Sequence, residues 1–260
     1  MSQKLLNLSS RLWFVTAAAG QLAFVLFIVT YYGSRTWRGD FAAWNNKPVI
    51  TGFVPGDSLG NLLFALHVLL GGVITLAGLL QLVPRIRQAA PGLHRWNGRL
   101  FLALAVFLAL DGVWKILVRG STLSTASTLS GLVGAALILL CCALAFYFAR
   151  RGQVVKHRRW ALRAFLVVSG VWFFRVGIMA WVILNQGPRG MNATLSGPAD
   201  VALAIGSYCV PLAGLQMYLW AQSSAAAGVK NLMSLLIVLL TGLMAVGIVG
   251  TVSMMWWPYL

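Results

Sequence analysis

The amino-acid sequence predicts an all-α membrane protein, a polytopic bundle of seven transmembrane helices that forms a single transmembrane domain over residues 1–260. The first observation is composition, because only 9% of the residues are charged and 60% are hydrophobic. Soluble domains carry about a quarter charged residues. The second is a mean hydropathy of +0.84. The third is a series of seven apolar runs, each near the ~20 helical residues that cross a bilayer core about 30 Å thick.

The limits of the spans follow from where the apolar runs meet charged or turn-forming residues. The first run begins after Arg11 and passes the alanines at 17–19 without a break, so we expect an uncleaved helix and not a signal peptide. The second ends at Pro84, and the fourth ends before Arg150. The third and fifth runs hold charges, whereas the other five hold none. The expected spans are residues 12–34, 58–84, 98–118, 123–149, 160–185, 200–222 and 232–255.

Two of the later spans carry residues that affect helix shape and packing. Pro211 is expected to bend the sixth span, because proline lacks the backbone N–H that a helix uses. In the seventh span, Gly242, Gly247 and Gly250 are expected to let a neighbouring helix approach closely.

The distribution of basic residues predicts the orientation of the helices. With the N-terminus inside, 13 of the 20 Lys and Arg residues lie on the inner side, five lie in outer loops and two lie within spans. Inner loops of membrane proteins are enriched in Lys and Arg, so the topology is N-in and C-out. The basic loops should also attract anionic lipid headgroups. Because the charges alternate with apolar spans and form no groove-facing patch, nucleic acid is not expected as a partner.

A short segment occurs twice in the chain. "PGLHRWNGRLF" at 91–101 returns as "KHRRWALRAF" at 156–165, and aligning Trp96 with Trp160 also matches Arg99 with Arg163. Both copies join an inward-running helix to an outward-running one. The sequence therefore predicts a parallel two-helix internal repeat, related by an axis along the membrane normal.

The same alignment places Asp111 opposite Arg175, each 12 residues after a matched arginine. Twelve helical residues rise about 18 Å, so both charges are expected at the same depth in the outer half of the bilayer. A charge there is costly and needs a partner. One hypothesis is an ion pair between Asp111 and Arg175. The other is that Lys115, four residues after Asp111, satisfies the carboxylate and leaves Arg175 free for a ligand.

A stripe of small and polar residues follows one face of the second span, from His67 to Gln81. His67 is expected near the depth of Asp111, so we predict a polar binding site in the outer half of the bundle. A packing network without a ligand stays open as an alternative. The candidate binding residues are His67, Asp111, Arg175, Gln81 and Lys115.

Haem is the competing hypothesis, because paired histidines on transmembrane helices can ligate one iron. His94 and His157 lie on the same expected side of the membrane, whereas His67 is more than ~25 Å away along the normal. These two histidines are therefore the candidate axial ligands of a b-type haem. A Soret absorption band that disappears in a His94→Ala variant would support this hypothesis.

Other chemistry has little support in the sequence. The chain contains no Glu, and its four carboxylates form no close pair. Cys141, Cys142 and Cys209 match no zinc or redox spacing. No phosphate-binding glycine loop or nucleophile motif is present. The sequence does not decide whether the protein is an enzyme or an oligomer.

The segments "LHVLLGGVITLAGLLQLVPRIR", "HRWNGR" and "HRRWALR", together with Arg175, resemble the predicted bacterial membrane proteins known as domain of unknown function 2306. The likeness covers about residues 60–190. It implies a multi-pass protein, here expected in the bacterial cytoplasmic (inner) membrane, and it implies no activity. From the residues themselves, the expected function is binding or transport of a small anionic or proton-linked solute, with haem-dependent electron transfer as the alternative.

Overall fold

The computed structural model describes residues 1–47 and 51–260, and within these ranges the chain is helical and has no strand. Six helices are long and apolar enough to cross a membrane, and there are seven spans if the bent pair α7 and α8 forms one. The expected all-helical, multi-pass architecture is therefore confirmed. The main helices are α1 (Ser2–Phe27), α3 (Ser58–Leu82), α4 (Pro84–Ala89), α5 (Pro91–Leu117), α6 (Thr125–Arg150), α7 (Val154–Val168), α8 (Gly170–Leu184), α9 (Pro198–Ser223) and α10 (Ala227–Gly250).

Short helical segments continue α1 and α10 beyond their C-terminal ends, on one side of the bundle. A π-helical turn η1 (Ile28–Gly33) and α2 (Ser34–Trp37) continue α1, and the short 3₁₀ helix η2 (Ala42–Asn46) follows. At the C-terminus of the chain, η3 (Thr251–Trp256) and η4 (Trp257–Tyr259) continue α10. Trp256 at the end of η3 stacks on both Phe24 and Phe27 of α1.

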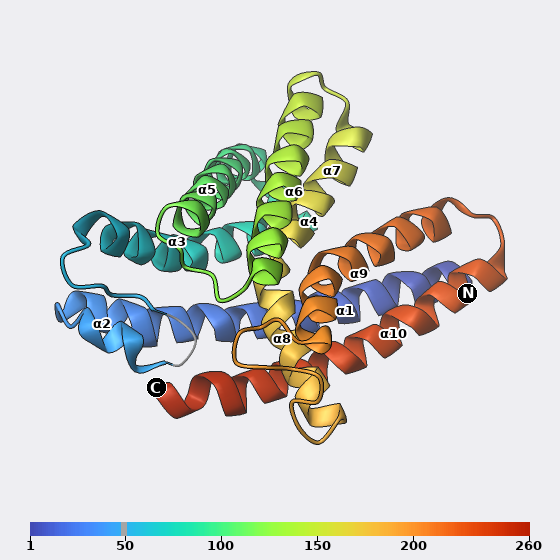
Figure 1. Cartoon of the computed structure of the whole chain (residues 1–260). Coiled ribbons are helices and arrows are strands. Elements are labelled where there is room, and N and C mark those ends of the chain that lie inside the picture. The colour runs from blue at the N-terminus through green and yellow to red at the C-terminus, as the bar shows by residue number, and fades with distance from the viewer. Residues whose placement is uncertain (48–50) are drawn as a thin grey trace.

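The helices pack in a chain of neighbours (Figure 1). α1 and α10 run side by side in the same direction, and α8 packs against α10. α3 packs against α5, α5 against α6, and α6 against α7. The N-terminal and C-terminal helices thus meet each other, and α3 to α7 extend from them.

Local residue chemistry sets where several helices begin. Asp57 caps α3, because its Oδ1 accepts a hydrogen bond from the Gly60 backbone N–H at 2.9 Å. Ser124 and Ser127 form a reciprocal capping box at the start of α6. α5 and α9 begin with a proline, whose missing N–H costs nothing in the first turn. α1 and α5 start at Ser2 and Pro91, earlier than the expected spans at 12 and 98.

The expected single span over 160–185 is divided at Ser169. α7 ends at Val168, α8 begins at Gly170, and the two helices meet at 54°. A Ser-Gly pair is a common site of helix kinks, which explains the break. Ser169 Oγ accepts a hydrogen bond from Gln21 Nε2 of α1 at 3.1 Å, so the break is also attached to the first helix.

The glycines of α10 behave as expected at two of three positions. A Cβ at Gly247 would overlap the backbone of Val176 on α8, and a Cβ at Gly250 would press on Ile183. These two glycines confirm the predicted close packing. The prediction is wrong for Gly242, which has no neighbouring atom within 4 Å of such a Cβ.

Candidate functional site

A cluster of three ionisable side chains joins α3 to α5. His67 Nδ1 lies 2.5 Å from Asp111 Oδ2, and the Lys115 ammonium donates to the same oxygen at 2.9 Å. The Asp111 side chain is 1% exposed and that of Lys115 is 11% exposed. Lys115 therefore satisfies the carboxylate from its own helix, as the second sequence hypothesis proposed.

The cluster is partly exposed at His67 and enclosed at Asp111. The His67 side chain is 36% exposed, and its Nε2 is the ring nitrogen that does not face Asp111. Asp111 Oδ1 is buried and has no hydrogen-bond partner among residues 1–47 and 51–260. An imidazole that contacts a buried carboxylate through one nitrogen can exchange a proton through the other. The arrangement can thus connect a buried carboxylate to its surroundings through His67.

Arg175 of α8 takes no part in an ion pair. Its guanidinium donates to the Val171 backbone oxygen of its own helix at 3.1 Å and lies 5.6 Å from the centre of the Phe24 ring. The ion pairs of the described residues do not include it. The hypothesis of an Asp111–Arg175 ion pair is therefore wrong, because the carboxylate is already held by Lys115 and His67.

Lys47 lies at the end of η2 and is buried against the C-terminal segment. Its ammonium donates to the Met255 backbone oxygen at 2.6 Å and lies about 5 Å from the Phe27 and Tyr259 rings. Burial, together with the positive charge of Arg175, lowers the pKa of Lys47 to about 8. Arg175 therefore shares its region of the structure with a second cation.

This lowered pKa predicts how stability depends on pH. The unfolded chain keeps Lys47 protonated up to its ordinary pKa of 10.5, so between about pH 8 and 10.5 the unfolded state binds more protons. The free energy of unfolding should then rise with pH, by at most about 1.4 kcal/mol per pH unit. Thermal melting in detergent from pH 7.5 to 9.5 measures this. Lys47→Met should reduce the rise, Lys4→Met should keep it in full, and an equal slope in all three proteins would contradict the assignment.

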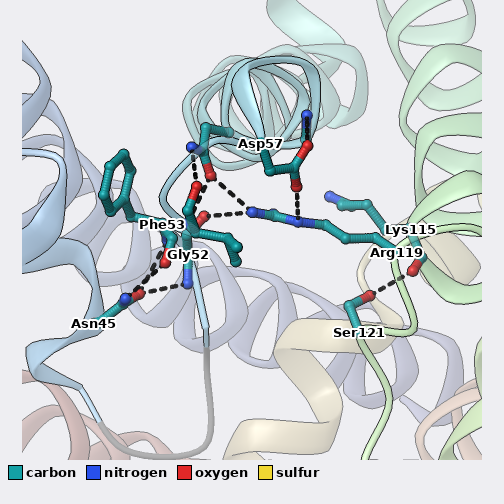
Figure 2. A network of polar contacts seen from close by, with 10 residues as sticks. Asn45, Gly52, Phe53, Asp57, Lys115, Arg119 and Ser121 are labelled. Carbon is teal, nitrogen blue, oxygen red and sulfur yellow. Dashed lines mark hydrogen bonds and ion pairs between the residues drawn. The ribbon is translucent and has the colours of Figure 1, made fainter.

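A polar network ties the loop before α3 to the end of α5 (Figure 2). Arg119 Nε lies 2.8 Å from Asp57 Oδ2, and its NH2 group donates to Gly52 O at 3.2 Å and to Asn61 Oδ1 at 2.8 Å. Asn45 binds the backbone of Gly52 and Phe53 from the other side. The network lies one helical turn beyond Lys115, so it fixes the end of the helix that carries the buried cluster.

Sequence reasoning missed Arg119 and Lys47 as structural partners of the site. For Arg119 a signal existed, because it follows Lys115 by four residues as Lys115 follows Asp111, although α5 ends at Leu117 and Arg119 lies just beyond it. For Lys47 the sequence holds no such signal. Its contacts join residues 208 positions apart.

Gln81 is not part of the same site as His67. It lies 14 residues further along α3, about 21 Å away along the helix axis. Its Nε2 donates to the His94 backbone oxygen at 2.9 Å. Gln81 therefore joins α3 to the start of α5, at the opposite end of α3 from the predicted binding site.

The two motif histidines occupy different surroundings. His157 Nδ1 lies 2.9 Å from the Ala145 backbone oxygen, which orients its ring toward α6. His94 Nδ1 is buried and has no hydrogen-bond partner in the described parts of the chain. No group of three or more metal-ligating side chains was found among the described residues. Haem ligation by His94 and His157 stays a prediction that the absorption spectrum tests.

The comparisons with known proteins agree with the resemblance noted in the sequence. The family model described as "Predicted membrane protein (DUF2306)" matches residues 64–201, which is more than half of the chain. The match includes His67, Asp111, Lys115 and Arg175. No curated protein and no solved structure matches the chain. The chain belongs to the DUF2306 family of predicted membrane proteins.

Proposed function

We propose that this protein binds, and in the bacterial inner membrane transports, a small anionic solute in a proton-linked manner. The binding residue is Arg175, and the proton-linked group is the cluster of His67, Asp111 and Lys115. The N-in and C-out topology predicted from the basic loops belongs to the same proposal. The observation that carries it is that Arg175 has no carboxylate partner in the described residues, since Asp111 binds Lys115 instead.

The balance of charge favours an anion as the ligand. Lys47, Lys115 and Arg175 bring three cationic groups to this half of the bundle, whereas Asp111 brings one carboxylate. An uncompensated charge within a membrane is costly and commonly marks a substrate pathway. The planar guanidinium also matches a carboxylate or phosphate, because its N–H groups can donate two parallel hydrogen bonds. An anion at Arg175 would offset the excess charge.

The proton linkage follows from the position of His67. One ring nitrogen contacts the buried Asp111 carboxylate, and the ring itself is partly exposed. Protonation of His67 adds a positive charge near a bound anion, so the anion and the proton should bind together. By linkage, binding of the anion should tighten as the pH falls through the range in which histidine titrates.

The experiment is a thermal melting screen of the detergent-solubilised protein with acetate, lactate, inorganic phosphate and sulfate at pH 6 and pH 8. We expect at least one anion to raise the melting temperature of the wild type, and more so at pH 6. Arg175→Gln should abolish that increase, because it removes the charge and the paired donors. Arg189→Gln is the matched control, since Arg189 lies in the exposed segment that follows α8.

The His67→Gln variant separates proton linkage from binding. It should still be stabilised by the anion but to the same extent at pH 6 and pH 8, because the titrating group is gone. If no anion of the panel stabilises the wild type, or if Arg175→Gln responds as the wild type does, the proposal is wrong. In proteoliposomes, the anion that binds should enter faster when an imposed pH gradient drives protons inward.

A further inference from the structure

A polar hollow lies between α7 and α9. It has a volume of about 220 Å³ and is lined by Arg159 and Arg163 of α7 and by Gln216, Leu219 and Ser223 of α9. Trp220 also lines it and at the same time lines an apolar hollow of about 150 Å³ between α9 and α10. The two hollows therefore adjoin each other at Trp220. One is cationic and the other is apolar.

We propose that this pair of hollows binds one anionic phospholipid of the surrounding bilayer. The phosphate lies between Arg159 and Arg163, and an acyl chain lies in the apolar hollow beyond Trp220. This site is separate from the one proposed around Arg175. It shares no residue with that site.

Arg163 is oriented for this role by contacts on three sides. Its guanidinium lies 4.8 Å from the centre of the Trp160 ring, one NH group donates to the Arg159 backbone oxygen, and the other donates to Gln216 Oε1 at 2.7 Å. A guanidinium has five N–H donors, so these bonds leave donors for a phosphate. An arginine that is already held in place loses less conformational entropy when it binds.

The first copy of the duplicated segment shows what is particular to this position. Arg99 lies over Trp96 at 4.7 Å, which is nearly the same stacking as that of Arg163 over Trp160. Neither Arg99 nor Trp96 lines a hollow described here. The stacking alone therefore does not make the site. The polar side chains of α9 complete it only beside Arg163.

The apolar half matches the acyl part of a lipid. Met217, Leu232, Met233 and Leu236 line it together with Trp220, whose side chain is 61% exposed. Tryptophan combines a large apolar ring with a polar N–H and is enriched where membranes meet water. A cationic hollow beside an apolar one fits a molecule with a phosphate at one end and a hydrocarbon chain at the other. Inorganic phosphate would use only the first hollow.

The test measures stabilisation of the full-length protein in a neutral detergent by added lipid. Thermal melting is followed while phosphatidylglycerol, phosphatidylcholine, glycerol phosphate or inorganic phosphate is titrated. We expect saturable stabilisation by phosphatidylglycerol alone. Arg159→Gln and Arg163→Gln should each raise the half-saturating lipid concentration about fivefold. Arg99→Gln, which removes the matched stacked arginine, should leave it unchanged.

Two further comparisons distinguish a loss of lipid binding from a folding defect. Arg159 is exposed and makes no side-chain hydrogen bond within the described residues, so its variant should fold normally. Trp220→Ala should weaken binding of the lipid without creating a response to glycerol phosphate. The proposal is overturned if phosphatidylcholine or a soluble phosphate stabilises the wild type as well as phosphatidylglycerol does. It is also overturned if Arg99→Gln weakens the lipid effect as much as the two α7 variants do.

Discussion

Gly247→Val is expected to reduce the yield of folded protein sharply and to lower its melting temperature. A side chain at this position would overlap the Val176 carbonyl of α8, and backbone cannot move aside as the end of a side chain can. Overpacking in a well-packed interior costs about 1–3 kcal/mol even when side chains can adjust. Because the conflict here is with backbone, we expect the upper part of that range or more.

Gly242→Val is the matched control for this prediction. It makes the same substitution on the same helix, but a Cβ there meets no atom within 4 Å. Melting of the purified variants in detergent, followed by tryptophan fluorescence, gives the comparison. Equal losses in the two variants would show that helix propensity and not packing is responsible.

The packing of α10 on α8 also bears on the proposed binding site. Thr251 donates to the Arg175 backbone oxygen at 3.3 Å, one helical turn after Gly247 contacts Val176. Arg175 therefore lies next to a close contact between α8 and α10. A bulky residue at 247 should displace α8 and with it the guanidinium. The smaller substitution Gly247→Ala is then expected to weaken anion binding at Arg175 in the protein that still folds.

Much of the helical architecture could be predicted from the sequence, because each signal was local. An apolar run of about 20 residues forms a helix in a bilayer whatever surrounds it, since every backbone group must be satisfied within the segment. Lys115 was likewise one of the two partners that the sequence suggested for the Asp111 carboxylate, because residues four apart share a helix face. Local spacing was also enough to recognise Gly247 and Gly250.

What the sequence could not supply were contacts between distant segments. The bend at Ser169 depends on a local Ser-Gly pair, but its contact with Gln21 joins residues 148 positions apart. The depth argument predicted Asp111 and Arg175 at one level along the membrane normal, yet depth does not fix which way a side chain points around its helix. For the same reason Gln81 was grouped with His67 on one helical stripe, although about 21 Å of helix separates them.

Removal of the Asp111 carboxylate is expected to have the other large effect on stability. Asp111→Leu keeps the branching of the side chain at Cγ but leaves the buried Lys115 ammonium without its partner. Breaking a buried pair on one side typically costs about 3–5 kcal/mol, because an uncompensated charge stays behind. Asp40→Asn serves as the control, since Asp40 is exposed and caps only the Ala43 N–H.

The double variant Asp111→Leu, Lys115→Met shows whether the stranded charge causes that loss. It should recover most of the stability lost by Asp111→Leu, because apolar replacement of both members of a buried pair is often neutral. If the double variant is as unstable as the single one, the carboxylate stabilises the bundle through His67 or by packing and not through Lys115.

The single variant Lys115→Met isolates the contact between His67 and Asp111. Without the lysine, a protonated His67 at 2.5 Å is the remaining ion-pair partner of the buried carboxylate among residues 1–47 and 51–260. Lys115→Met should therefore lose less stability at pH 6 than at pH 8, whereas the wild type should show a smaller difference. The additional variant His67→Gln should remove this pH dependence. A pH-independent loss in Lys115→Met would mean that His67 does not exchange a proton beside Asp111, and the proposed linkage of anion and proton would lose its physical basis.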